Sequence, residues 1–183
     1  MPFAVKSSLD VAFWFMDRAL NDREYLQPQK LHKLMFLSQA YYPAAYPGRT
    51  LMPAHFVTDM FGPIEPTVFH VLSNGRPNMI DTNPVAEAVR GFLDGIWRRF
   101  GQYSAEQLFR KLSDHDPVAV AMEKGEGTEI PLTEMVNFYA TTTSKRKADV
   151  PAPSEVIKPR MLRSQSGKAV TVSTWSPKTL GGK

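Results

Sequence analysis

The sequence contains no cysteine among its 183 residues. A chain without thiols has no disulfide framework, no thiolate nucleophile and no cysteine-ligated zinc site. It also lacks the run of about 18–20 apolar residues that crosses a bilayer, and its first residues lack the regions of a secretory signal. We therefore expect a cytoplasmic protein without a membrane partner. A chain of this length favours one packed domain.

Acidic residues are scarce at the C-terminal end. Residues 143–183 hold nine Lys or Arg against two acidic residues, a net charge of +7, whereas the first 142 residues hold 13 basic and 16 acidic residues, a net charge of −3. The same region has scattered prolines and a single aromatic residue, Trp175. Such a composition has no face to bury. We predict a domain over residues 1–142 and a disordered, basic, flexible tail over residues 143–183.

Apolar residues recur at helical spacing through the first 142 residues, and capping residues mark the starts of helices. The buried stripe of the first helix is expected to consist of Leu9, Ala12, Phe13, Met16 and Leu20, with Asp10, Asp17 and Arg18 off it. The residues expected to open helices are Ser7 or Ser8, Pro28, Pro66, Pro84, Ser104 with Gln107 in a capping box, Asp116 and Thr133.

One short segment favours β-structure. Residues 56–61 are β-branched and aromatic, and residues 79–80 are the expected pairing partner. The prolines at positions 63 and 66 exclude a central strand there and indicate a stiff turn. The predicted fold class is mainly α (α+β), a compact helical domain with a short two-stranded β element.

Groups for catalysis are few. The four histidines form no pair at metal-ligand spacing, and the sequence has neither a glycine-rich phosphate loop nor a G-x-S-x-G nucleophile motif. We expect a protein that is not an enzyme and that needs no metal or cofactor. One alternative is a hydrolase that uses Asp114, His115 and Asp116, an acid-flanked base that is also an ordinary start of a helix.

Four motifs follow one another in the domain with regular gaps. They are KLHKLMFLSQAYY at residues 30–42, GRTL at 48–51, FGPIEP at 61–66 and IWRRFGQYSAEQL at 96–108. This series resembles the KLQKLLYFAQ, small-residue turn, Y-G-P-V-x-P and V-W-x-x-Y-G-x-x-S-x-x-x-L elements of the Panacea-domain, or SocA-like, antitoxin family. The resemblance covers about residues 8–140. It departs from the family at Phe61 and Phe100, where tyrosine is usual, and after Pro117, where no tryptophan follows.

The resemblance implies an antitoxin of a toxin–antitoxin system that neutralises a protein toxin by direct binding, in bacteria, their phages or mobile elements. It also implies a second route, in which the antitoxin is an adaptor that delivers the toxin to an ATP-dependent protease. Large aromatic side chains beside a stiff turn suit such a binder, although they also suit a core. The candidate toxin-binding residues are Tyr41, Tyr42, Tyr46, Phe61, Pro63, Ile64 and Glu65.

The tail offers a second set of contacts. Residues 169–175 have high β-propensity and could add a strand to a partner's sheet. The candidate partner-binding residues of the tail are Arg160, Arg163, Val170, Val172 and Trp175. The tail could bind the toxin or the protease, or fold back on its own negatively charged domain. As an alternative function, the protein is a nucleic-acid-associated phage or mobile-element regulator whose tail binds phosphates.

Overall fold

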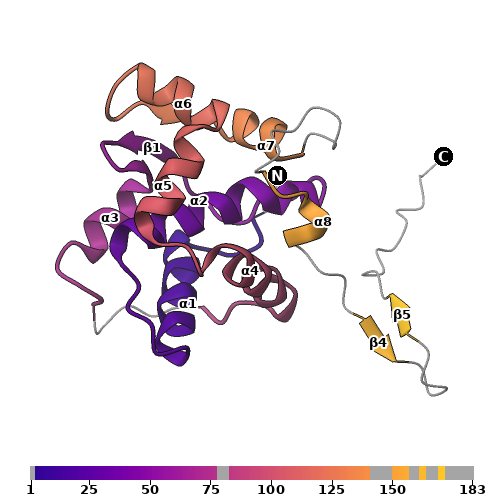
Figure 1. Ribbon diagram of the computed structural model, residues 1–183. Helices are drawn as coiled ribbons and strands as arrows, with labels where there is room; N and C mark the ends of the chain where they lie inside the picture. The colour runs from indigo at the N-terminus through magenta and orange to yellow at the C-terminus, as the bar shows by residue number, and fades with distance from the viewer. Residues whose placement is uncertain (1–2, 78–82, 141–149, 157–160, 164–168, 172–183) are drawn as a thin grey trace, which may run out of the picture.

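The computed structural model describes residues 3–77, 83–140, 150–156, 161–163 and 169–171 (Figure 1). The predicted fold class is confirmed, because these residues form a mainly helical domain with a small sheet. The helices are α1 (Ser8–Asn21), α2 (Pro28–Ala45), α3 (Pro66–Leu72), α4 (Glu87–Phe100), α5 (Ala105–Ser113), α6 (Asp116–Glu123), α7 (Leu132–Ala140) and α8 (Pro153–Val156). The strands are β1 (Phe56–Asp59), β2 (Gly62–Ile64), β3 (Glu129–Ile130), β4 (Met161–Arg163) and β5 (Ala169–Thr171).

Helix α2 runs through the centre of the domain (Figure 1). It packs against α1, α4, α5, α7, α8 and strand β2. Every residue from 30 to 42 is buried, polar ones included. A helix buried around its whole circumference has no outward stripe, and its polar side chains must find partners inside the protein. Gln39 is one example: its amide donates to the Met52 carbonyl at 2.9 Å and accepts from the Met52 N–H at 3.2 Å.

Helix α1 buries most of the predicted stripe. Ala12 and Phe13 are buried as expected, and Leu9 and Met16 are half-buried. Leu20 is instead 72% exposed, and Phe15, which was not predicted, is buried.

The expected cap at Ser7 is confirmed, and Asp10 completes the capping box by accepting from the Ser7 N–H at 3.1 Å. Asp10 also accepts from the Asn83 N–H at 3.0 Å and is buried. These two hydrogen bonds explain why a carboxylate expected off the buried stripe faces the interior.

The sheet has the strand order β2-β1-β3, and both pairings are antiparallel. Strand β1 ends at Asp59, two residues earlier than predicted, and a two-residue turn joins it to β2. The stiff turn predicted around Pro63 is therefore an edge strand, a position that tolerates a residue without an N–H. The other partner of β1 is β3, and the expected pairing with residues 79–80 lies outside the described residues.

The packed part of the chain extends beyond the predicted boundary at residue 142. Residues 150–156 lie against α2 and α4, with Val150 and Val156 buried. Strands β4 and β5 form an antiparallel hairpin, so residues 169–171 pair with residues 161–163 of the same chain and not, as expected, with the sheet of a partner. No helix in the described segments is long and apolar enough to span a membrane.

Candidate functional site

The turn between β1 and β2 exposes two apolar side chains. Met60 is 61% exposed and Phe61 is 44% exposed, and α3, which follows β2 directly, presents Phe69 at 54% exposure. We call these three residues the tip surface. Exposure of large apolar side chains to water is unfavourable, and on a turn these side chains add nothing to the core. Their exposure is therefore typical of a contact surface.

The base of this hairpin is held firmly. Gly62 has a φ of +105°, which side-chain-bearing residues rarely adopt. A Cβ there would lie 3.1 Å from Cδ2 of Phe109 on α5, so the hairpin and α5 are in close contact. On the other side, the Thr58 hydroxyl donates to the Gly125 carbonyl at 2.7 Å, which ties β1 to the loop after α6. Backbone geometry therefore requires glycine at position 62.

A lysine lies beneath the hairpin. Lys33 is only 1% exposed, and its ammonium group donates to the Gln29 carbonyl at 3.2 Å and lies 5.9 Å from the centroid of the Phe109 ring. Burial lowers the pKa of Lys33 from 10.5 to about 8, and the negative charge of Asp59 opposes this shift. At neutral pH, Lys33 therefore carries a positive charge that its buried environment disfavours.

His32 lies next to this lysine and is also buried. Its Nδ1 atom accepts a hydrogen bond from the Glu65 N–H at 3.2 Å. Burial, together with the charge of Lys33, lowers the pKa of His32 from 6.5 to about 4. The imidazole is therefore neutral at pH 7, and because Nδ1 accepts, its proton is on Nε2.

Glu65 is not available to a partner, contrary to the prediction. It is 1% exposed and caps α3, since its carboxylate accepts from the Val68 N–H at 2.7 Å. The Ser8 hydroxyl donates to the same oxygen at 3.4 Å. The carboxylate thus links the starts of α1 and α3. Pro63 is buried and Ile64 is half-buried, so Phe61 is the one candidate of this turn that is exposed.

The predicted tyrosines do not join Phe61 in one surface. Tyr41 and Tyr42 are buried, with Tyr41 packed at 4.8 Å (ring centroids) from Tyr139 and Tyr42 at 5.0 Å from Phe92. Tyr46 is half-buried against Tyr42. Tyr41 and Tyr42 lie in the C-terminal half of α2, about 12–14 Å along the helix axis from Lys33, the residue beneath the hairpin. The alternative, that these aromatic side chains form the core, is correct for Tyr41 and Tyr42.

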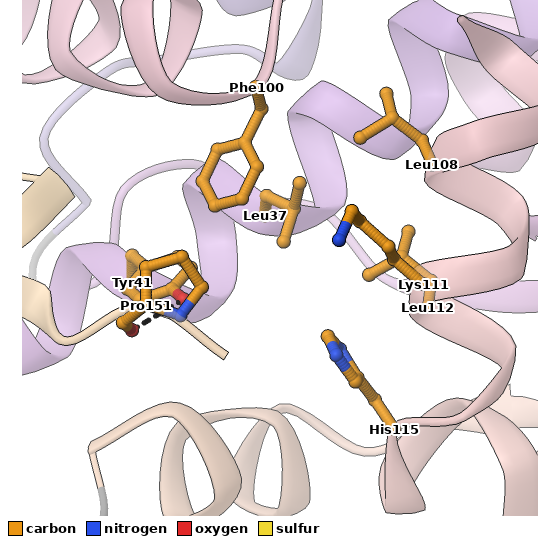
Figure 2. A pocket seen from close by; sticks show the side chains of 8 residues that line it. All are labelled: Leu37, Tyr41, Phe100, Leu108, Lys111, Leu112, His115 and Pro151. Atoms are coloured by element: carbon orange, nitrogen blue, oxygen red, sulfur yellow. Dashed lines mark hydrogen bonds between the residues drawn. The ribbon is translucent and has the colours of Figure 1, made fainter. Parts of the chain in front are cut away.

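The acid-flanked histidine is a core residue. His115 is buried, with its Nδ1 atom 2.6 Å from the Tyr139 hydroxyl, whereas Asp114 and Asp116 are exposed. The adjacent cavity, shown in Figure 2, has a volume of about 10 Å³, about enough for one water molecule and too little for a substrate. The residues that line it are Leu37, Tyr41, Phe100, Leu108, Lys111, Leu112, His115 and Pro151.

The remaining candidates are placed in part. Arg163 lies in β4 and Val170 in β5, while Arg160, Val172 and Trp175 lie outside the described residues. Within the described ranges, no three His, Asp or Glu side chains gather as a metal site would require. A search of family models, curated proteins and solved structures finds no match to the chain.

The sequence analysis missed two residues of the tip surface, Met60 and Phe69. An apolar pair at the two-residue turn of a hairpin is the signal for Met60, because turns usually carry Gly, Asn or Asp. This signal can be used only if the turn is placed at residues 60–61. The predicted strand extended to residue 61, so Met60 was expected to lie within the strand.

Proposed function

We propose that this protein is a binding module that acts as an antitoxin and neutralises a protein toxin through direct contact with the tip surface. The observation that carries the proposal is the exposure of Met60 and Phe61 on a hairpin with a firmly held base. Interface hot spots combine large apolar side chains with a rigid support, because little conformational entropy is then lost on binding.

The resemblance to the Panacea-domain family supports this proposal. The segments that carry the resemblance lie in α2, in β2 with the start of α3, and in α4 with α5. Helix α2 contacts β2, α4 and α5, so the motifs meet around one helix. A shared fold would require such contacts among its defining motifs. Delivery of the toxin to an ATP-dependent protease in the cytoplasm of a bacterium is the second part of the proposal.

A co-expression experiment tests the proposal. The tagged full chain is co-expressed with the product of the neighbouring gene, and we expect that product to be toxic alone and to be captured in stoichiometric amount. Replacement of the two turn residues of the tip surface (Met60→Ser with Phe61→Ser) is expected to abolish capture and protection. Tyr25→Ser is the matched control, because Tyr25 is 82% exposed and lies in the loop between α1 and α2.

Two outcomes contradict the antitoxin proposal. A harmless neighbour that is not captured removes the antitoxin function, and capture that survives the tip substitutions removes the tip surface as its site. A variant without residues 157–183 then separates the domain from the tail. This truncation keeps residues 150–156, which pack on the domain.

The second candidate function is a nucleic-acid-associated regulator, and the charge of the tail favours it. Residues 157–183 contain six Lys or Arg and no acidic residue. Contacts to phosphates release counterions, so the logarithm of the binding constant is expected to fall with the logarithm of salt concentration at a slope of up to about 5. Loss of this slope on deletion of residues 157–183 supports the regulator, whereas weak binding that does not depend on salt excludes it.

A further inference from the structure

Residues 150–156 return to the helical domain as a short, separate segment, which we call the latch (Figure 1). Three of its apolar side chains are buried: Val150, Pro151 and Val156. Ser154 and Glu155 face outward. The latch contacts α2 and α4, and we call the surface of these two helices that it covers the groove.

The latch makes its own local structure. The Ala152 N–H donates to the Glu155 carboxylate at 2.6 Å, and the Glu155 N–H donates back to the Ala152 carbonyl at 2.9 Å. A segment whose polar groups bond to one another needs few hydrogen bonds from the surface that holds it. One hydrogen bond to the domain is present: the Tyr41 hydroxyl donates to the Pro151 carbonyl at 2.9 Å, as Figure 2 shows.

The latch also closes the cavity beside His115. Pro151 forms one wall of that cavity, and Tyr41 and Phe100 lie next to it (Figure 2). Without the latch, the cavity would be continuous with the groove between α2 and α4. The groove would then present an apolar floor and one hydroxyl donor, a combination that suits a peptide with apolar side chains and a free carbonyl before a proline-containing turn.

We propose that the groove between α2 and α4 is a peptide-binding site for segments with a Val-Pro pair followed five residues later by Val. The chain's own latch fills this site at rest, and such a segment of a partner protein displaces the latch. The site is distinct from the tip surface, and it does not depend on the proposed antitoxin function.

Competition with the latch makes the proposal measurable. An intramolecular ligand on short connectors has an effective concentration in the millimolar range, so a free peptide binds poorly while the latch is intact. The probe is a fluorescein-labelled peptide of residues 149–157, titrated into the full chain and read by anisotropy. The variant Val150→Asp with Val156→Asp disables the latch and leaves the groove unchanged. We expect the peptide to bind this variant at least ~10-fold more tightly than the intact chain.

Two controls test the chemistry of the site. A peptide with the same two valines replaced by aspartate is expected not to bind. Tyr41→Phe in the disabled-latch background is expected to weaken peptide binding by about 3-fold to 10-fold, since one hydrogen bond is lost. Equal binding to the intact and disabled chains, or equal binding of the substituted peptide, would overturn the proposal.

A second measurement does not disturb the latch contacts. Because the chain has no cysteine, spin labels can be attached at Ser154→Cys and Arg98→Cys, two exposed positions on the latch and on α4. We expect one narrow distance distribution that becomes long and broad when the unlabelled peptide is added in millimolar excess. A distribution that does not change with peptide overturns the proposal. Dimers with exchanged latches, seen as intermolecular distances, would assign the groove to a second copy and overturn the assignment to a partner.

Discussion

Replacement of the buried lysine beneath the hairpin is expected to stabilise the protein. Lys33 is 1% exposed, and burial lowers its pKa to about 8. At about 1.4 kcal/mol per pKa unit, the charge of Lys33 costs the native state about 3 kcal/mol at pH 7. Methionine is unbranched and similar in length, so Lys33→Met should raise the free energy of unfolding by about 2–3 kcal/mol at that pH.

The pH dependence distinguishes this effect from better packing. Between pH 8 and 10.5 the unfolded chain keeps the proton on Lys33 while the native state has lost it, so the stability of the wild-type protein rises with pH in this window. Above pH 10.5 the lysine is neutral in both states. The advantage of Lys33→Met should therefore be largest at pH 7 and should disappear across this window.

Urea denaturation followed by far-UV circular dichroism at several pH values measures the difference between the two proteins. Lys6→Met is the matched control, since Lys6 is exposed and the same change there is expected to stay within about 0.5 kcal/mol. A variant that is less stable than the wild type at pH 7 would refute the reasoning. An advantage that does not change with pH would show that packing, and not desolvation of the charge, is its cause.

Two other perturbations test the same region. The wild-type protein should lose up to about 3 kcal/mol of stability as pH falls from 6.5 to 4. The reason is that the unfolded chain binds a proton at His32 in this range, whereas the native state, in which the pKa of His32 is about 4, does not. His32→Asn keeps an acceptor near the Glu65 N–H and should remove this part of an acid-denaturation profile. Gly62→Ala should destabilise the protein by about 1–3 kcal/mol in thermal denaturation, because of its positive φ and its contact with Phe109. Gly91→Ala, in an exposed and open position of α4, should instead stabilise it by about 0.5–1 kcal/mol. Equal effects of the two alanines would contradict the backbone argument.

The sequence predicts the helices well where local chemistry decides. The caps at Ser7 and Ser104 are in the structure as expected, and Gly101 follows the last residue of α4. Each of these depends on hydrogen bonds within one turn of the helix, so the residues that form it are close together in the sequence. The positive φ of Gly62 is likewise a property of the local backbone.

Which residues face outward was harder to predict, and α2 shows why. Apolar periodicity identifies a face only if the opposite face meets water, and α2 is surrounded by other elements. Tyr41 and Tyr42 therefore carry no sequence signal that separates a core position from a contact surface. Glu65 is a similar case, because the buried cap of a short helix has the same residue type as a solvated surface carboxylate.

The latch could not be predicted from periodicity either. Its buried residues are Val150, Pro151 and Val156, a spacing that matches neither the helical nor the strand repeat. They are surrounded by the polar and basic residues that led us to predict a tail. The partner surface is complete only after α2 and α4 have packed, so the information lies in tertiary structure.

The buried polar residues of α2 give this central helix a fixed orientation. Three of them bond to parts of the chain outside α2: Lys30 to the Gly101 carbonyl, His32 to the Glu65 N–H, and Gln39 to the Met52 backbone. A one-residue slip of an α-helix rotates its side chains by about 100°, so a slip would break all three contacts and bury the polar groups without partners. A wholly apolar helix in this position would lose less stability in such a slip, because it has no polar groups to leave without partners. We infer that α2 keeps these three polar groups in the core because they fix the position of the helix that supports both the hairpin and the latch. Lys33 adds a cost in stability without this benefit, since its hydrogen bond is to Gln29 of α2 itself.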